Sequence, residues 1–247
     1  MMKDSAHDSL HIYRVLYQAL AIAESYSEIN RDVLIASCLL HDIGRTAQFR
    51  DPSLCHAVEG GKMAYCFMRE LGWDEKLCVH IQDCITTHRF RTDNQPKTLE
   101  AKILFDADKL DITGAPGITR SLVYEGEIGE PLYTTDESGR VQDGRSSREP
   151  DSFLKKYHFK LIRCYDTFYT KEAKLIAQKR KKAHRGLLQR ADGGNQPPRC
   201  WRLAETDSIN SAVVISMKSL PFLFGSIVGQ VPIYFWLRGL VLWQNIF

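Results

Sequence analysis

Along the first 190 residues, apolar positions recur at the three- and four-residue spacing of amphipathic helices. The spacing is clearest over residues 8–27, and further helices are expected over residues 32–41, 55–71, 73–88, 99–112 and 153–190. The Gly-Ala-Pro-Gly sequence at 114–117 is expected to interrupt the helical structure after residue 112, with a short helix following up to Tyr124. No strand-like alternation stands out, so the predicted fold class is all-α.

The helix expected over residues 32–41 is apolar on nearly every side, which is typical of a helix buried at the centre of a bundle. Asn30 and Asp32 are candidates for its N-cap, because their side chains can accept a hydrogen bond from the first turn. Gly44 is expected to end it.

Two stretches depart from the helical pattern. Residues 125–151 are rich in Gly, Pro and polar residues, and we interpret them as a long loop that acts as a lid over a site. After residue 190 a linker at 191–198 precedes an apolar stretch, of which residues 219–237 carry no charge. That length suits a membrane span, although Pro and Gly interrupt it. We therefore expect one domain over residues 8–190 and, over 191–247, a linker with an apolar tail outside the fold; a membrane segment within residues 213–243 is the alternative.

The charge and cysteine content exclude several classes of protein. The net charge is +3, which is too small to indicate nucleic-acid binding. The basic run at 174–190 has apolar residues at helical spacing and no interleaved aromatics, so we interpret it as a solvated helix face and expect no nucleic-acid partner. The seven cysteines form no Cys-x-x-Cys pair, and no signal peptide precedes the first helix, so a reduced, cytoplasmic protein is expected.

The candidate chemistry begins with His41 and Asp42, which follow the apolar helix directly. Adjacent helical residues point about 100° apart, so the remaining ligands of a shared metal must come from other helices. His11 and one of Asp106 and Asp108 are the candidates. Two imidazoles and two carboxylates form a mixed nitrogen and oxygen site that suits Mn²⁺, Mg²⁺, Fe²⁺, Co²⁺ or Ni²⁺. A metal of this kind lowers the pKa of a water molecule and so supplies a nucleophile near neutral pH.

The order of these motifs resembles the HD-domain superfamily of metal-dependent phosphohydrolases, and most of all its small bacterial stand-alone members. The motifs are His11-Ile-Tyr-Arg14, Leu40-His41-Asp42-Ile43-Gly44, Cys55-His56-Ala57, Thr87-His88 and the stretch from Ile103 to Asp111. The resemblance covers roughly residues 8–190. It implies an all-α HD-domain bundle with a metal held by His11, His41, Asp42 and Asp108.

The resemblance selects Asp108 over Asp106, because the family's ligand usually precedes a basic or small residue and then Leu, as Lys109 and Leu110 do here. Asp106 is then a neighbour that contacts the substrate or supports the ligands. Lys109 is either a phosphate contact or a solvated lysine on the helix surface.

The remaining roles stay open at this stage. His56 and His88 either bind a second metal or the substrate phosphate, or are polar surface residues. Arg14 is a phosphate contact or the structural partner of a carboxylate. Some relatives carry a Glu three residues after the His-Asp pair as a candidate base, but Arg45 occupies that position here, so Asp42 or a neighbouring histidine would assist.

The resemblance implies hydrolysis of a phosphoester or phosphoanhydride bond in a small phosphorylated substrate, with a nucleotide as the expected one. A cyclic-nucleotide or alarmone phosphodiesterase is an alternative, although the Gly-Tyr-Pro signature of the cyclic-dinucleotide subgroup is absent. The other alternative is a non-catalytic regulatory or membrane-tethered module with a structural metal.

Overall fold

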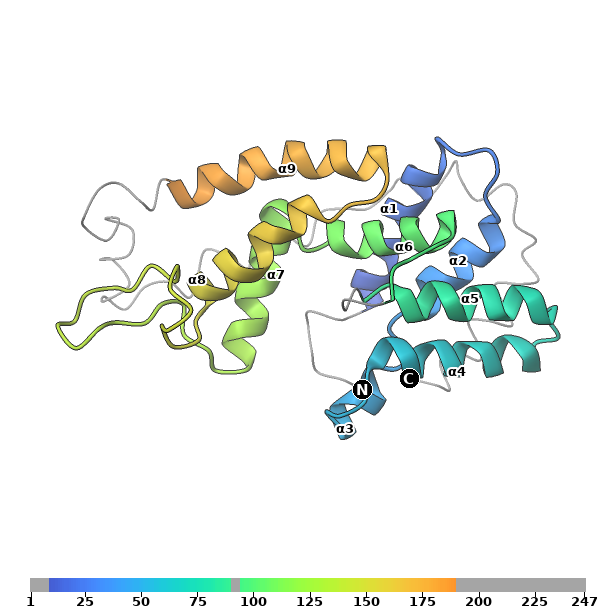
Figure 1. Cartoon of the computed structure of the whole chain (residues 1–247), viewed down its shortest axis with the longest axis horizontal. Coiled ribbons are helices and arrows are strands. Elements are labelled where there is room, and N and C mark those ends of the chain that lie inside the picture. Colours follow the sequence, from blue (N-terminus) through green and yellow to red (C-terminus); the bar gives the residue numbers. More distant parts are fainter. Residues whose placement is uncertain (1–8, 90–93, 190–247) are drawn as a thin grey trace. The chain divides into compact units, whose positions relative to one another are not determined.

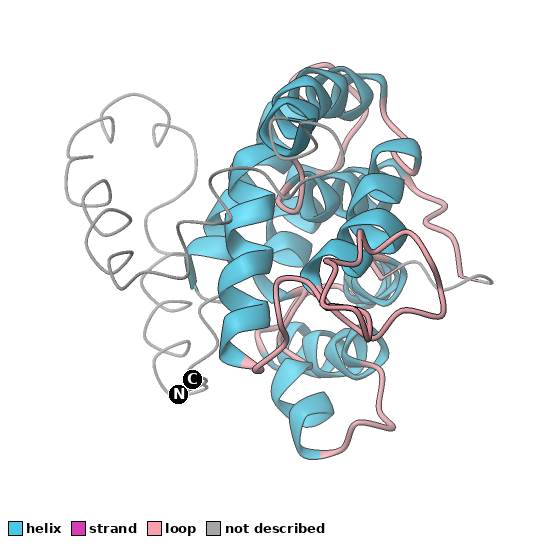
Figure 2. Cartoon of the chain, turned by 90° about the vertical axis from the view of Figure 1, so that its left-hand side faces the viewer, coloured by secondary structure: helices cyan, strands magenta, loops and turns pink. Residues whose placement is uncertain are grey.

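A bundle of helices forms the part of the chain that this computed structural model describes, residues 9–89 and 94–189, with the side chains of 182–189 left aside (Figure 1). Within these residues there is no β-strand, only an isolated antiparallel bridge between Thr135 and Val141 (Figure 2). The all-α prediction is therefore confirmed. The elements are α1 (Ser9–Ala23), α2 (Arg31–Leu40), α3 (Arg45–Arg50), α4 (His56–Glu70), α5 (Glu75–Thr87), α6 (Leu99–Leu110), α7 (Gly114–Glu127), α8 (Phe153–Lys156), a π-helix (Tyr157–Leu161), a 3₁₀ helix (Ile162–Asp166) and α9 (Lys171–Gln189).

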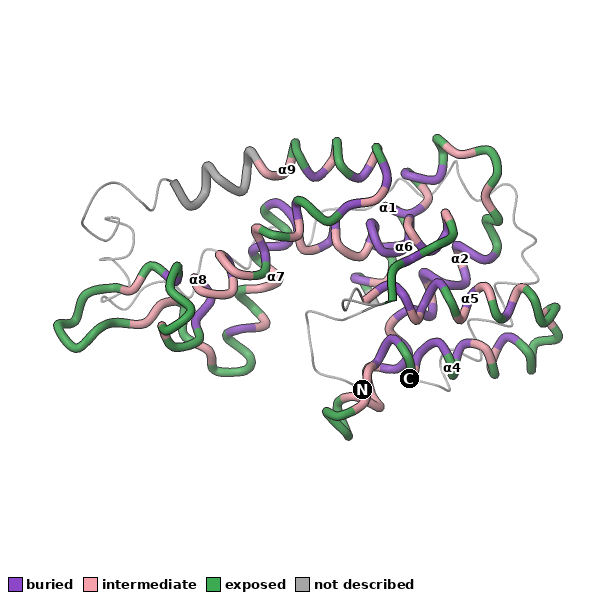
Figure 3. Tube along the Cα trace, in the orientation of Figure 1, coloured by how far each residue is buried: buried purple, intermediate pink, exposed green. Residues whose placement is uncertain are grey.

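Helix α2 lies at the centre of the main core, as its apolar sequence predicts (Figure 3). It packs against α1, α5 and α6, and Val33, Leu34 and Cys38 are fully buried. Asn30 is its N-cap, since the Asn30 side chain accepts a hydrogen bond from the Val33 amide at 3.1 Å. The central helix thereby fixes the position of the His41-Asp42 pair that follows it.

The prediction that Gly44 ends this helix is wrong. Helix α2 ends at Leu40, and Gly44 is the residue before α3 with an ordinary helical φ of −78°. Its role is close packing, because a Cβ placed on Gly44 would lie 2.2 Å from the backbone oxygen of His56 and 2.5 Å from the Gly60 amide nitrogen. The absence of a side chain lets the turn after His41-Asp42 lie directly against the start of α4.

The segment after α6 also differs from the expected break. Gly114 adopts a positive φ of 69° and starts α7, which continues to Glu127. Pro116 lies in the first turn, where a missing amide hydrogen costs no helical hydrogen bond. The Gly-Ala-Pro-Gly sequence therefore marks a sharp turn into a full helix.

The region expected to be helical over 153–190 consists of several helical segments. Helix α8 passes into the π-helix and the 3₁₀ helix before α9 begins at Lys171. Phe153, Tyr157 and Leu161 form a second small core with Ile118 of α7. A change between helix types leaves the apolar spacing nearly unaltered, so the sequence pattern did not reveal it.

The residues between α7 and α8 form an exposed loop (Figures 2 and 3). Its recorded contacts hold it to those two helices: the Phe153 amide donates to the Pro131 carbonyl at 3.0 Å, and Lys156 Nζ lies 2.7 Å from both Glu125 Oε2 and Glu130 Oε2. The lid role stays a prediction. The linker and the apolar tail at 191–247 lie outside the described residues, among which no helix has the length and apolarity needed to span a bilayer.

Candidate metal centre

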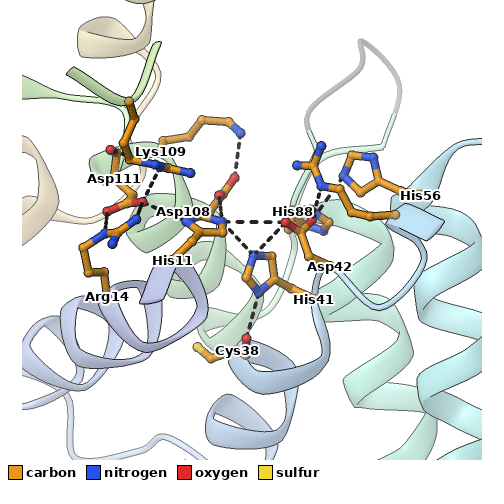
Figure 4. Close-up of polar contacts among 12 residues, drawn as sticks. His11, Arg14, Cys38, His41, Asp42, His56, His88, Asp108, Lys109 and Asp111 are labelled. Atoms are coloured by element: carbon orange, nitrogen blue, oxygen red, sulfur yellow. Dashed lines mark hydrogen bonds and ion pairs between the residues drawn. The ribbon is translucent and has the colours of Figure 1, made fainter. Parts of the chain in front are cut away.

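Histidines from the ends and interiors of separate helices converge on Asp42 (Figure 4). His11 comes from α1, His41 and Asp42 directly follow α2, His56 is the first residue of α4, His88 directly follows α5, and Asp108 comes from α6. The four histidines are buried, each with an exposed fraction of 2% or less. The structure therefore brings together the six residues that the sequence offered as metal ligands.

One side of the cluster combines His11, His41 and Asp108. The Nε2 atoms of His11 and His41 lie 3.3 Å apart, and His11 Nε2 lies 3.5 Å from Asp108 Oδ1. Asp42 Oδ2 faces this group at 3.7 Å from both imidazole Nε2 atoms. The ligand atoms of His11, His41 and Asp108 are close enough to bind one cation in common.

The other side combines His56 and His88 with the second oxygen of Asp42. Asp42 Oδ1 lies 3.6 Å from His56 Nε2 and 3.8 Å from His88 Nε2. Asp42 thus presents one carboxylate oxygen to each half of the cluster. A carboxylate placed in this way can contribute one ligand atom to each half of the cluster.

Each imidazole is oriented by an oxygen acceptor at its Nδ1 atom. The acceptors are Asp111 Oδ2 for His11 at 2.7 Å, the Cys38 carbonyl for His41 at 2.7 Å, Gln48 Oε1 for His56 at 2.7 Å and the Ile85 carbonyl for His88 at 2.6 Å. An oxygen acceptor requires the proton on Nδ1, so the lone pair of the ring in its neutral form lies on Nε2. His56 Nδ1 also lies 3.2 Å from Arg89 Nη1, but the Gln48 oxygen is the closer partner and favours the same tautomer as in the other three rings. All four Nε2 atoms therefore face the centre of the cluster as potential metal ligands.

The protonation states fit metal binding as well. Burial lowers the pKa of His56 to about 3 and that of His88 to about 4, so both rings are neutral near pH 7. Burial raises the pKa of Asp42, but the electrostatic interactions with His41 and Arg45 outweigh it and hold the pKa well below its ordinary value. Burial likewise raises the pKa of Asp108, and Lys109 and His11 reverse this effect. Ionised carboxylates and neutral imidazoles are the forms that bind metals.

Polar atoms at the centre lack hydrogen bonds, which supports a cation at this position. Both oxygens of Asp42 and the Nε2 atom of His56 are buried without a hydrogen-bond partner. Arg45 Nε balances part of the charge, at 2.9 Å from Asp42 Oδ1, as an ion pair. Buried polar atoms without partners are costly, and a divalent cation among them would remove that cost. The donor set of imidazoles and carboxylates suits the metals expected from the sequence.

Asp106 does not reach the cluster, so the expectation that it contacts the substrate or supports the ligands is wrong. Its carboxylate accepts hydrogen bonds from the Thr170 amide at 2.7 Å, the Thr170 hydroxyl at 2.6 Å and the Tyr169 amide at 2.9 Å. Positions two apart on a helix point about 200° apart, so Asp106 faces the start of α9 while Asp108 faces the histidines. Asp106 anchors α9.

Asp111 is the residue that the sequence reasoning missed. Besides His11 Nδ1, its carboxylate accepts hydrogen bonds from Arg14 Nε at 2.8 Å and Arg14 Nη2 at 3.1 Å, and it pairs with Arg120. Arg14 is thus the partner of a carboxylate. Asp111 lies three positions after Asp108, on the same helix face, and that spacing was a signal that could have identified it.

Two cationic side chains flank the cluster. Lys109 Nζ lies 2.9 Å from Asp108 Oδ2, and Arg45 lies beside Asp42 at the opposite half. Lys109 is 22% exposed and Arg45 27% exposed, whereas the histidines are buried. Of the other histidines, His80 lies 3.2 Å from Glu100, while His7 and the His184 side chain lie outside the described residues.

Comparisons with known proteins agree with this fold. Residues 9–113 match the model of the HD domain family, and this range includes every residue of the cluster. Residues 9–113 are therefore similar to the HD domain family, and the helical bundle that contains them is similar to solved HD superfamily hydrolases.

The chain is similar to the uncharacterized protein YpgQ of Bacillus subtilis, with 27% identity over 192 residues that cover 76% of this chain and 82% of YpgQ. The crystal structure of YpgQ in complex with ADP has a TM-score of 0.59 at 25% identity and covers 77% of this chain and 90% of that one. A predicted HD superfamily hydrolase from an uncultured Thermotogales bacterium has a TM-score of 0.52 at 27% identity, with 76% of this chain and 81% of that one covered.

The chain also resembles the 3′-5′ exoribonuclease YhaM of Bacillus subtilis, at 30% identity over 115 residues. That match covers 41% of this chain and only 37% of YhaM. The likeness to YhaM is therefore restricted to part of the nuclease.

Proposed function

We propose that this protein is a metal-dependent phosphohydrolase that cleaves a phosphoester or phosphoanhydride bond of a nucleotide. The observation that carries the proposal is the convergence of four imidazole Nε2 atoms around Asp42, whose two oxygens have no hydrogen-bond partner. This convergence favours a centre that binds divalent cations.

The two halves of the cluster support a centre for two cations. His11, His41 and Asp108 would hold one with Asp42 Oδ2, and His56 and His88 would hold the other with Asp42 Oδ1. Mn²⁺, Fe²⁺, Mg²⁺, Co²⁺ and Ni²⁺ all suit such ligands. Bound divalent cations polarise phosphoryl oxygens and lower the pKa of water, which is the chemistry that phosphoester hydrolysis requires.

The chain itself contributes orientation and charge. The hydrogen bonds at the Nδ1 atoms fix the four rings, and the ion pairs of Arg45 and Lys109 place a positive charge beside each half of the cluster. A guanidinium and an ammonium at these positions can bind phosphoryl oxygens and stabilise the negative charge that develops on them. In this proposal His56 and His88 are metal ligands, and Lys109 contacts the phosphate.

A nucleotide is the proposed substrate class because YpgQ, which shares the fold and most of the chain length, has been crystallised with ADP. The name of YhaM, an exoribonuclease, indicates a related phosphodiester chemistry in a longer protein. A cyclic nucleotide or an alarmone would also bring a phosphoester or phosphoanhydride bond to this centre.

The test is release of phosphate and pyrophosphate from a panel of nucleoside mono-, di- and triphosphates with Mn²⁺, Mg²⁺, Co²⁺ or Ni²⁺. The panel includes a cyclic dinucleotide, an alarmone and a short RNA, to distinguish the alternatives. We expect metal-dependent release by the wild type and by Asp83→Ala, an exposed carboxylate of α5, and at least a hundredfold loss in Asp42→Ala. A folded, metal-loaded wild type without activity on any substrate would indicate a structural or regulatory metal instead.

A further inference from the structure

Helix α3, the short helix that the sequence analysis did not predict, is built differently from its neighbours (Figure 1). It begins three residues after Asp42, and none of its six residues is buried. Gln48 anchors it to the cluster through the 2.7 Å hydrogen bond to His56 Nδ1, and Arg89 Nη1 donates to the same Gln48 oxygen at 3.4 Å. A helix without buried residues, whose last two residues are exposed, is thus held beside the candidate metal centre.

Phe49 of this helix is 82% exposed, more than any other large apolar side chain in the described part of the chain. Leaving a phenyl ring in water forfeits the free energy of burying it, and packing within the chain does not explain its position. Its neighbour Gln48 is committed to His56, which fixes the direction of the helix.

Phe49 lies four positions after Arg45, so both side chains project from the same face of α3. Arg45 reaches inward to Asp42 Oδ1, at 2.9 Å. Four residues of helix advance about 6 Å, so Phe49 lies about one turn further along α3 than Arg45. A single helix face therefore presents a guanidinium beside the cluster and an aromatic ring beyond it.

We propose that this face of α3 is the nucleotide-recognition element: Arg45 binds a phosphoryl oxygen and Phe49 stacks on the nucleobase. The inference rests on the proposed function and adds the residues that select a nucleoside. Every base has a π-face, so stacking tolerates all four bases. The protein is therefore selective for nucleotides over phosphorylated compounds without a base, and it discriminates weakly among the bases.

The test compares two uncleavable probes at saturating Mn²⁺ by calorimetry: adenosine 5′-(α,β-methylene)diphosphate and methylenediphosphonate, which lacks the nucleoside. Phe49→Ala should weaken binding of the nucleotide probe by about tenfold, the scale of one stacked base, and leave the affinity for methylenediphosphonate unchanged. Phe49→Trp should restore binding. Arg45→Met should weaken the binding of both probes. Arg50→Met on the same helix, and Leu175→Ala at an exposed position of α9, should change neither affinity. The metal content of each variant is measured in parallel.

Unchanged nucleotide binding by Phe49→Ala would overturn the inference, as would an equal loss for both probes, because the ring would then act through the helix and not on a base. Wild-type binding and hydrolysis would in either case still support the proposed function. A metal-loaded wild type that binds neither probe would overturn the proposed function and this inference with it.

Discussion

Asp111 Oδ2 accepts a hydrogen bond from His11 Nδ1 at 2.7 Å, while the same carboxylate pairs with Arg14 and Arg120. Two arginines thus keep the carboxylate ionised and in place: burial raises the pKa of Asp111, but these hydrogen bonds and charges lower it to about 2. The carboxylate in turn fixes the tautomer of a candidate ligand. Asp111 is a positioning residue, because it reaches the centre only through His11.

The first prediction follows from this pair. Asp111→Ala should lower the affinity for Mn²⁺ by about 10- to 100-fold, the usual effect of losing a group that orients a metal-bound histidine. Asp111→Asn, which retains an oxygen acceptor, should lower the affinity for Mn²⁺ less than Asp111→Ala does. Metal titration of the purified protein checks both, with Asp83→Ala as the control. Equal affinity in all of these variants would show that the imidazole needs no such support.

A second prediction concerns the number of metal ions. The wild type should bind two per chain, because Asp42 has one oxygen facing each ligand group. His88→Ala and Asp108→Ala should each retain one ion, and Asp42→Ala should weaken both sites. Plasma emission spectrometry after dialysis against dilute Mn²⁺ gives the counts. The prediction is contradicted if the wild type binds a single ion that is lost in Asp108→Ala and kept in His88→Ala. The centre would then hold one metal, bound by His11, His41 and Asp108.

A third prediction concerns Gly44. Gly44→Ala would force a Cβ against the backbone of His56 and Gly60, so the free energy of unfolding should fall by about 1–3 kcal/mol or more, as in other overpacked sites. Gly126→Ala in α7 is the matched control: no atom lies within 4 Å of its added Cβ, and it should stabilise the protein by about 0.5–1 kcal/mol. Urea denaturation measures both. Similar stabilities for the two variants would contradict the packing role of Gly44.

A fourth prediction concerns pH. Tyr26 donates a hydrogen bond to Glu172 at 2.7 Å, which raises the pKa of Tyr26 from 10.0 to about 12 and lowers the pKa of Glu172. A raised pKa in the folded state stabilises the protein fully below pH 10 and loses that effect as the pH rises towards 12. The lowered pKa of Glu172 has the opposite sign, so its contribution is lost as the pH falls below the ordinary value of 4.5.

The advantage of the wild type over Tyr26→Phe in unfolding free energy should therefore be flat between about pH 5 and 10 and decline on both sides. Denaturation of the two proteins across this range, in matched buffers, measures it. A difference that does not change with pH would mean that the hydrogen bond between Tyr26 and Glu172 is absent in solution.

The fold was predictable where burial follows helical spacing. Residues 8–27 and 99–112 show a clear apolar face, and α1 and α6 begin and end within a few residues of the expected limits. Helix α3 has the sequence Arg-Thr-Ala-Gln-Phe-Arg, and without an apolar face the pattern could not indicate it. The change to a π-helix at Tyr157 was equally hidden, because the next apolar residue falls near the same face in either helix type.

The residues of the site were selected by their order in the sequence, and the structure brings the selected set together. The contacts around them could not be predicted. Whether Gln48 or a backbone carbonyl accepts the Nδ1 proton of His56 depends on how α3 and α4 pack, which no local pattern encodes. The same holds for Arg120, which reaches Asp111 from the next helix.

The ligands of the candidate centre come from five helices spread between His11 and Asp108, so the set exists only when the whole bundle has closed. Unfolded chains would scatter these groups and bind metal weakly. By mass action, each tenfold excess of free metal over the dissociation constant would then add about 1.4 kcal/mol to the free energy of unfolding. Metal supply in the cell would consequently govern the lifetime of the protein against proteolysis as well as its chemistry. Chelation of the metal should therefore shorten that lifetime, whatever its effect on substrate turnover.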